Sequence, residues 1–262
     1  MKLSGQQLRN LDRDGFLVLP ALFSAGEVAA IRARLPALLA QDHPGNVIER
    51  ASGEVRTTMG LHLRDPLFAR LVRHPRLIEP AGQILDQPMY VQQVKVNVKA
   101  AFSGEVWQWH YDFATHKAED GVPLPLALNL HIFLDEVNQF NGPLYFVPGS
   151  HRAGEHGATL DTETTSYPLW VCDQDTVRDR VAENGLVAAT GGPGTALIFH
   201  DTLLHGSPNN MSPWDRAIFS LIVNPVSNAF TRTDRPDYKH HRDLTPVEPL
   251  DDDCLETPAA VA

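Results

Sequence analysis

Hydrophobic and polar residues alternate strictly between positions 90 and 99. One side of this stretch carries Tyr90, Gln92, Val94, Val96 and Val98, and the other carries Val91, Gln93, Lys95, Asn97 and Lys99. A period of two predicts a β-strand whose alternate side chains share a face. The polar row therefore meets either solvent or a polar cavity, and a solvated face is the commoner explanation for such a row.

Other short apolar runs predict strands at residues 16–22, 126–134, 144–147, 195–199 and 217–223, separated by Gly, Pro and Asn turns. Helix signals gather before residue 88. Capping boxes at Ser4 and Ser24 predict two helix starts, and Pro66 and Pro75 open two more helices, over 66–72 and 75–85. A short helix over 177–183 is predicted between strands. Many short strands with turn punctuation indicate a barrel or double-sheet jelly roll.

We therefore expect a mostly β fold with flanking helices, in a single domain over residues 1–262. A helical N-terminal part with one strand, residues 1–88, would pack on a β-core over residues 89–228. The remaining residues, 229–262, would form a C-terminal wrap to about Leu250 and then a loose tail.

Composition and charge narrow the class of protein. The chain is 43% hydrophobic, enough for one sizeable core, and its net charge of −10 without a basic stripe argues against nucleic-acid binding. No apolar run is long enough to cross a membrane, and residues 1–10 lack the apolar core of a signal peptide. Cys172 and Cys254 form neither a disulfide framework nor a zinc-binding spacing. We expect a cytoplasmic protein that acts as a monomer or homodimer, without membrane or nucleic-acid partners.

The candidate chemistry centres on Trp107-Gln108-Trp109-His110-Tyr111-Asp112. On a strand, His110 and Asp112 would point to the same face and could hold one metal ion with an imidazole nitrogen and a carboxylate oxygen. Two histidines and one carboxylate on one face are typical of non-haem iron(II) oxygenases. The best third ligand is His205, which follows the apolar run Ala196–Phe199.

Arg216 follows His205 after the turn Ser-Pro-Asn-Asn-Met-Ser-Pro. If this turn closes a hairpin, Arg216 lies beside His205 on the neighbouring strand. A guanidinium there suits a bidentate contact with the distal carboxylate of 2-oxoglutarate. Taken singly, His110 suits a hydrogen-bonded core position, His205 a loop edge and Arg216 a surface ion pair. Their order and strand context together favour the iron site.

Several consecutive motifs resemble the phytanoyl-CoA dioxygenase superfamily, and within it the bacterial proline 4-hydroxylases and ectoine hydroxylases. The matching segments include Asp14-Gly15-Phe16, Leu71-Val72-Arg73-His74-Pro75-Arg76, Trp109-His110-Tyr111-Asp112, Asn141-Gly142-Pro143-Leu144, Val147-Pro148-Gly149-Ser150-His151 and His205-Gly206-Ser207. The resemblance implies a double-stranded β-helix that holds Fe(II) through His110, Asp112 and His205. It also implies that Arg216 and Ser207 hold the distal carboxylate of 2-oxoglutarate. Asn97 matches an asparagine that contacts 2-oxoglutarate, and Gln93 matches a glutamine that touches substrate.

Further residues are candidates for the walls of the pocket. Trp107 is a candidate wall for 2-oxoglutarate, although packing is its commoner role. Asn129 and His131 share a strand face and either line the pocket or form a structural pair. Where the related hydroxylases carry a tryptophan, this chain has His116, a candidate substrate contact or an exposed loop histidine. The departure leaves the identity of the substrate open.

The expected function is hydroxylation of an unactivated carbon in a small free amino acid or similar zwitterion, proline-, leucine- or ectoine-like, with Fe(II), 2-oxoglutarate and O₂, in specialised metabolism. Desaturation, epoxidation or cyclisation could use the same site. A zinc hydrolase could use the same three ligands, but no candidate general base accompanies them and Arg216 would have no role. The alternative from another class is a non-catalytic β-barrel that binds a ligand.

Overall fold

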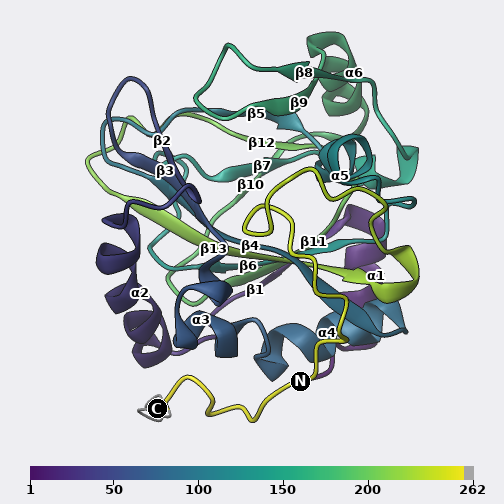
Figure 1. The fold of residues 1–262 in the computed structure, drawn as a ribbon. Coiled ribbons are helices and arrows are strands. Elements are labelled where there is room, and N and C mark those ends of the chain that lie inside the picture. The colour runs from purple at the N-terminus through teal and green to yellow at the C-terminus, as the bar shows by residue number, and fades with distance from the viewer. Residues whose placement is uncertain (257–262) are drawn as a thin grey trace.

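The computed structural model describes residues 1–256, whose strands form two facing antiparallel sheets (Figure 1). The larger sheet has the order β1-β11-β6-β13-β4-β3-β2. Its strands are β1 (Phe16–Leu19), β2 (Asn46–Ile48), β3 (Val55–Met59), β4 (Met89–Lys99), β6 (Leu128–Phe133), β11 (Ala196–His200) and β13 (Arg216–Pro225). The smaller sheet has the order β10-β7-β12-β5, with β5 (Trp107–His110), β7 (Leu144–Phe146), β10 (Val187–Ala189) and β12 (His205–Ser207). Beyond it lies a two-stranded ribbon of β8 (Ala158–Asp161) and β9 (Leu169–Cys172).

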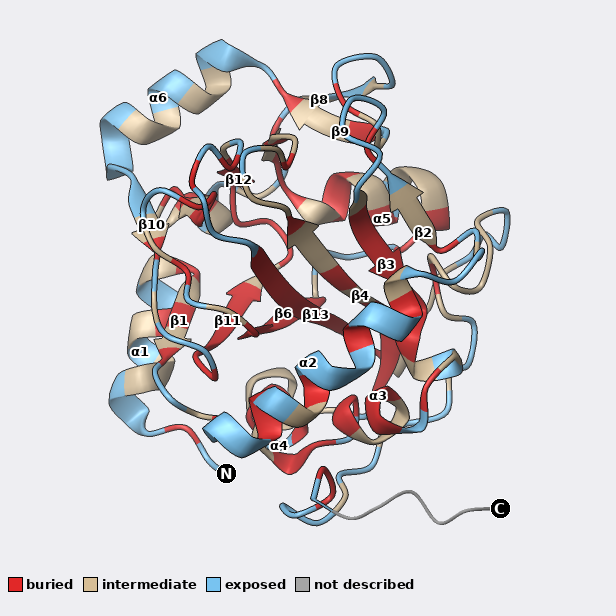
Figure 2. Cartoon of the chain, turned by 90° about the vertical axis from the view of Figure 1, so that its left-hand side faces the viewer, coloured by how far each residue is buried: buried red, intermediate tan, exposed pale blue. Residues whose placement is uncertain are grey.

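Helices α2 (Ala25–Leu39), α3 (Pro66–Leu71) and α4 (Pro75–Leu85) lie on the side of the larger sheet that faces away from the smaller one (Figures 1 and 2). Helix α1 (Gly5–Asp14) packs beside β1. Helices α5 (Asp112–Asp120) and α6 (Gln174–Asn184) lie on the opposite side of the larger sheet from α2, α3 and α4, near the β8–β9 ribbon. Short 3-10 helices are η1 (Leu61–Leu63), η2 (Ser150–Ala153) and η3 (Val226–Asn228). The capping boxes at Ser4 and Ser24 are both present, so the predicted helix starts are confirmed.

The main hydrophobic core fills the space between these helices and the larger sheet. Ile31 of α2 and Phe68 of α3 are fully buried there against Val94, Val96 and Phe219. Each such side chain stabilises the fold by about 1.5–3 kcal/mol. Because this core lies outside the sheet pair, the space between the two sheets need not be filled with apolar side chains throughout.

Strand β4 shows how one strand serves the core and the interior between the sheets. Val94 and Val96 point into the core, while Gln93, Lys95 and Asn97 line a cavity between the sheets. The sequence left two alternatives for this polar row, solvent or a polar cavity, and the structure shows that it faces a cavity. The predicted alternation fails only at Gln92, where the register with β13 shifts and Val91 joins the core. Such a bulge inserts one residue and exchanges the faces beyond it.

Some predicted boundaries are wrong. The N-terminal part contributes three strands to the larger sheet, since β2 and β3 extend it beyond β4. Residues 251–256 are not a loose tail: Cys254 and Leu255 are buried in the main core, and Arg70 Nε donates to Cys254 O at 2.8 Å. Residues 257–262, the rest of the predicted tail, lie outside the described residues. Within residues 1–256, no helix is both long and apolar enough to span a membrane.

Candidate active site

Three predicted metal ligands converge at one end of the cavity. His110 ends β5, His205 begins β12 and is its register partner, and Asp112 is the first residue of α5. The prediction that Asp112 lies on the strand is therefore wrong. Tyr111 is still extended, with φ −134° and ψ 141°, so the alternation that aims His110 and Asp112 the same way holds up to the helix start.

The three ligand atoms lie within 4.8 Å of one another. Asp112 Oδ1 is 3.8 Å from His110 Nε2, and Asp112 Oδ2 is 3.9 Å from His205 Nε2. Nδ1 of His110 lies 2.6 Å from Gln108 O, and Nδ1 of His205 lies 2.8 Å from Leu203 O. A carbonyl only accepts, so each Nδ1 carries the hydrogen and each Nε2 lone pair faces the others. This is the arrangement in which neutral histidines bind a metal.

The surroundings keep these ligands in their metal-binding forms. Burial, and then the neighbouring His205, lowers the pKa of His110 to about 3, so its ring is neutral at physiological pH. Asn129 Nδ2 donates to Asp112 Oδ2 at 3.0 Å and fixes the orientation of the carboxylate. Two imidazoles and one carboxylate, grouped on one side of an open cavity, suit Fe(II) with positions left for other ligands.

Arg216 lines the cavity from the larger sheet and is only 1% exposed. The turn between them does not close a hairpin, because His205 lies in β12 of the smaller sheet and Arg216 in β13 of the larger one. Arg216 Nη2 donates to Gly142 O and, at 3.0 Å, to Ser207 Oγ, which itself donates to Gly142 O at 2.9 Å. Arg216 Nε is buried without a partner among the described residues. Burial lowers the pKa of Arg216 to about 9, which leaves it cationic at neutral pH.

The remaining cavity wall joins residues that the sequence singled out with others that it did not. Of the predicted residues, Gln93, Asn97, Trp107, His116, Asn129 and His131 line the cavity, whereas Ser207 is absent from the lining and contacts Arg216. The residues missed were Lys95, Thr115, Leu144, Tyr167, Leu169, Phe199, Ile218 and Arg235. Lys95 could have been found, since it lies between Gln93 and Asn97 on the same strand face. Tyr167 and Arg235 come from loops that carry no comparable signal.

Two histidines of the cavity wall, His116 and His131, differ in the partners of their ring nitrogens. His116 Nδ1 lies 3.0 Å from Asp201 Oδ1, a buried pair. Burial lowers the pKa of His116, but Asp201 outweighs this effect and the pKa is raised overall. His131 packs edge-on against Phe199, and within the described chain neither of its ring nitrogens has a partner. Burial, followed by the charge of Lys95, lowers the pKa of His131 to about 3, so it is a neutral wall residue.

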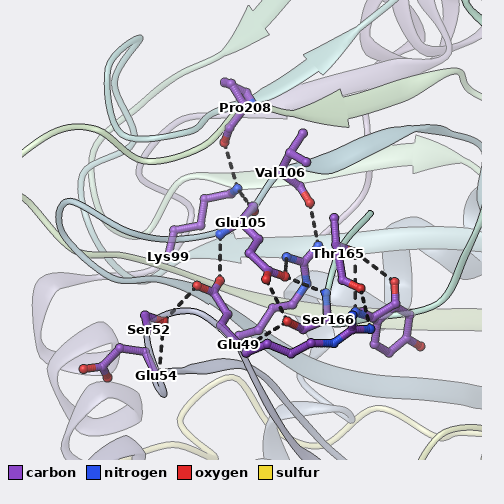
Figure 3. A network of polar contacts seen from close by, with 12 residues as sticks. Glu49, Ser52, Glu54, Lys99, Glu105, Val106, Thr165, Ser166 and Pro208 are labelled. Atoms are coloured by element: carbon purple, nitrogen blue, oxygen red, sulfur yellow. Dashed lines mark hydrogen bonds and ion pairs between the residues drawn. The ribbon is translucent and has the colours of Figure 1, made fainter. Parts of the chain in front are cut away.

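Glu105 and Ser166 belong to a network of polar contacts (Figure 3). This network adjoins Trp107 and Tyr167, two residues of the cavity wall. Glu105 accepts hydrogen bonds from the backbone N and Oγ of Ser166, both at 2.7 Å, and pairs with Arg56 Nη1 at 3.0 Å. The Arg56 guanidinium stacks 3.9 Å from the Trp107 ring centre. Glu105 thus ties the segment before Tyr167 to the wall around Trp107. Lys99 is absent from the lining, because its Nζ donates to Glu105 O and Pro208 O.

Comparison with known proteins places the chain in a family. Residues 11–218 match the family model of phytanoyl-CoA dioxygenase (PhyH). The chain is 40% identical over 253 residues to an L-proline trans-4-hydroxylase of Streptomyces griseoviridis, covering 93% of this chain and 94% of that one. It is 37% identical over 236 residues to an ectoine dioxygenase of Sphingopyxis alaskensis, covering 86% of this chain and 77% of that one.

A solved structure supports the same conclusion. EctD from S. alaskensis with 2-oxoglutarate and 5-hydroxyectoine superposes with a TM-score of 0.81 at 34% identity, covering 95% of this chain and 86% of that one. The predicted double-stranded β-helix, a jelly roll with flanking helices, is thereby confirmed. The chain belongs to the phytanoyl-CoA dioxygenase (PhyH) family.

Proposed function

We propose that the protein is an Fe(II)- and 2-oxoglutarate-dependent dioxygenase that hydroxylates an unactivated carbon of a small free amino acid or similar zwitterion. One observation carries the proposal: a His-Asp-His group and a buried arginine with an unpartnered Nε line the same cavity. The named activities of the relatives, L-proline trans-4-hydroxylase and ectoine dioxygenase, indicate the substrate class.

His110, Asp112 and His205 would hold the iron. Bound iron, together with 2-oxoglutarate and O₂, supplies the transfer of one oxygen atom to a C–H bond while 2-oxoglutarate becomes succinate and CO₂. The chain's own part is to fix the ligands. The two Nδ1–H···O=C contacts set the ring orientations, and Asn129 holds the carboxylate of Asp112.

Arg216 would bind the distal carboxylate of 2-oxoglutarate. Its Nη2 is oriented by Gly142 O and Ser207 Oγ, which positions the planar guanidinium before any ligand arrives. A rigid, buried guanidinium suits a bidentate carboxylate contact better than a flexible ammonium would. Asn97 and Trp107 line the cavity beside it and complete our proposed cosubstrate site.

The substrate would occupy the part of the cavity lined by Gln93, His116, Asn129 and His131. Apolar side chains, Leu144, Leu169, Phe199 and Ile218, complete the lining and limit the entry of water. Excluding water protects the reacting carbon from side reactions and strengthens the polar contacts that orient it.

The proposal is tested with anaerobically reconstituted protein supplied with Fe(II) and 2-oxoglutarate, then air, against the twenty proteinogenic L-amino acids and ectoine. Succinate is quantified and products are weighed, with His110→Ala as the control. We expect succinate that depends on one amino acid, and a product heavier by one oxygen atom, both lost in the control. Succinate with a product lighter by two hydrogens would favour desaturation. Absence of both succinate and bound iron would refute the proposal and favour a non-catalytic binding protein.

A further inference from the structure

The cavity holds a cation that neither the metal ligands nor Arg216 accounts for. Lys95 lies on β4 between Gln93 and Asn97, and all three line the cavity. Its Nζ donates to Gln93 Oε1 at 2.7 Å. Within the described part of the chain, Lys95 forms no ion pair with a carboxylate. Its site in the cavity wall removes water and lowers its pKa, and an anion at Nζ would offset that effect.

The other cations on this side of the cavity are already neutralised. Arg235 forms a bidentate pair with Asp120, with two N–O distances of 2.8 Å. His116 is paired with Asp201 at 3.0 Å. Asp112, the one carboxylate among the described lining residues, is a proposed metal ligand. Unlike Arg235 and His116, Lys95 therefore lacks a counter-charge. A bound anion would supply that negative charge.

Gln93 adds a second, complementary group. Its Nε2 donates to Lys239 O at 2.7 Å, which fixes the amide and directs Oε1 toward Lys95. One N–H of the Lys95 ammonium donates to Gln93 Oε1, which leaves the ammonium further N–H donors for an anion and leaves Oε1 a second lone pair for a donor such as an amine. A cationic donor directly beside a neutral acceptor matches a carboxylate directly beside an amine, which is the head group of an α-amino acid.

We propose that Lys95 and Gln93 form the head-group site for the substrate, with Lys95 binding its carboxylate and Gln93 Oε1 accepting from its amino group. This rests on the proposed function and specifies which part of the substrate the chain requires. The register supports the division of roles. Arg216 of β13 lies opposite Lys99 in the register of the two strands. Lys95 is four residues, roughly 13 Å, further along β4. The two cations therefore serve separate carboxylates, one on the substrate and one on the cosubstrate.

The test compares Lys95→Met, which removes the charge, with Lys95→Arg, which keeps it. The matched control is Lys117→Met, at an exposed lysine that pairs with Glu155 outside the cavity. Each protein is titrated anaerobically, in the presence of Fe(II) and 2-oxoglutarate, with the twenty L-amino acids and with their carboxamides, and binding is measured by calorimetry. Apparent KM values for the amino acid with the highest turnover and for 2-oxoglutarate are measured in air.

Loss of a charge-assisted contact corresponds to roughly a 10- to 100-fold weaker interaction. We expect wild type to bind the best amino acid at least about tenfold more tightly than its carboxamide. Lys95→Met should lose this preference, and its KM should rise for the amino acid but not for 2-oxoglutarate. Lys95→Arg should recover part of the preference and part of the wild-type KM for the amino acid. The control should match wild type.

Three results would overturn this assignment. The first is equal binding of amino acid and carboxamide by wild type. The second is an unchanged preference in Lys95→Met, above all if Arg235→Gln loses it instead. The third is a Lys95→Met variant in which only the KM for 2-oxoglutarate rises, which would indicate that Lys95 binds the cosubstrate. Failure of the proposed function is distinguishable, because it would remove 2-oxoglutarate consumption from wild type in air, whereas the calorimetry needs no turnover.

Discussion

Replacing Arg216 should raise the apparent KM for 2-oxoglutarate while leaving the fold intact. The guanidinium is buried, its Nη2 contacts Gly142 O and Ser207 Oγ, and its Nε lacks a partner in the described chain. A carboxylate can accept two charge-assisted hydrogen bonds from it, each stabilising the complex by about 1.5–3 kcal/mol. The sum, about 3–6 kcal/mol, corresponds to roughly a 10²- to 10⁴-fold rise in KM for Arg216→Met.

Stability should not fall in parallel. Burial, the largest effect, disfavours the charge of Arg216; Asp135 offsets part of this cost, and the nearby cation Arg56 adds to it. The net effect is unfavourable to the charge, so Arg216→Met should unfold at a temperature no lower than that of wild type. Arg216→Lys keeps the charge without the fork geometry and should give an intermediate KM.

The assay measures succinate release against 2-oxoglutarate concentration at saturating amino acid. Turnover should recover at high 2-oxoglutarate, because the metal ligands His110, Asp112 and His205 are unchanged. A KM for 2-oxoglutarate within about threefold of wild type, in a folded variant that binds iron, would be far smaller than the expected rise in KM and would refute the assignment of Arg216.

Three further predictions concern a metal ligand, the Glu105 network and the buried carboxylate of Glu27, which pairs with Arg76. His205→Ala should lose iron, measured by metal analysis after desalting, whereas stoichiometric iron would contradict its role as a ligand. Glu105→Gln should lower the free energy of unfolding in urea by about 1–3 kcal/mol, since Ser166 and Arg56 lose their charged partner; an unchanged midpoint would contradict this. Burial raises the pKa of Glu27, but contacts with Arg76 and Ser24 outweigh it and lower the pKa below 4.5. Glu27 therefore stabilises the fold above pH 4.5, and this contribution is lost as the pH falls through its lowered pKa. The free energy of unfolding, measured against pH, should lack this pH-dependent contribution in Glu27→Gln. Identical pH profiles for the variant and wild type would contradict the prediction.

Local signals in the sequence predicted much of the fold. Capping boxes at Ser4 and Ser24 act within one helical turn, so the helix starts could be read directly. The alternation through β4 predicted a strand and its polar row, because the two-residue period is also a local signal. Strands β2 and β3 were missed because they are short and lack a long apolar run; residues such as Arg56 and Thr57 are buried there by polar and tertiary contacts.

The candidate site shows the same division. His110 and Asp112 were paired correctly because one extended residue separates them, although the helix start at Asp112 was not foreseen. The hairpin that would have placed Arg216 beside His205 does not form, since a turn between two strands does not reveal that the strands belong to opposite sheets. Tyr167 and Arg235 reach the cavity from loops held by Glu105 and Asp120 through contacts distant in sequence, which no local pattern encodes.

The most direct test of the central claim is the fate of labelled oxygen. Wild-type protein with Fe(II), 2-oxoglutarate and its amino-acid substrate is supplied with ¹⁸O₂, and succinate and product are weighed. We predict one labelled oxygen atom in succinate and one in the hydroxylated amino acid, formed in equal amounts. Product oxygen that comes from water, or product formed without succinate, would contradict a 2-oxoglutarate-dependent dioxygenase.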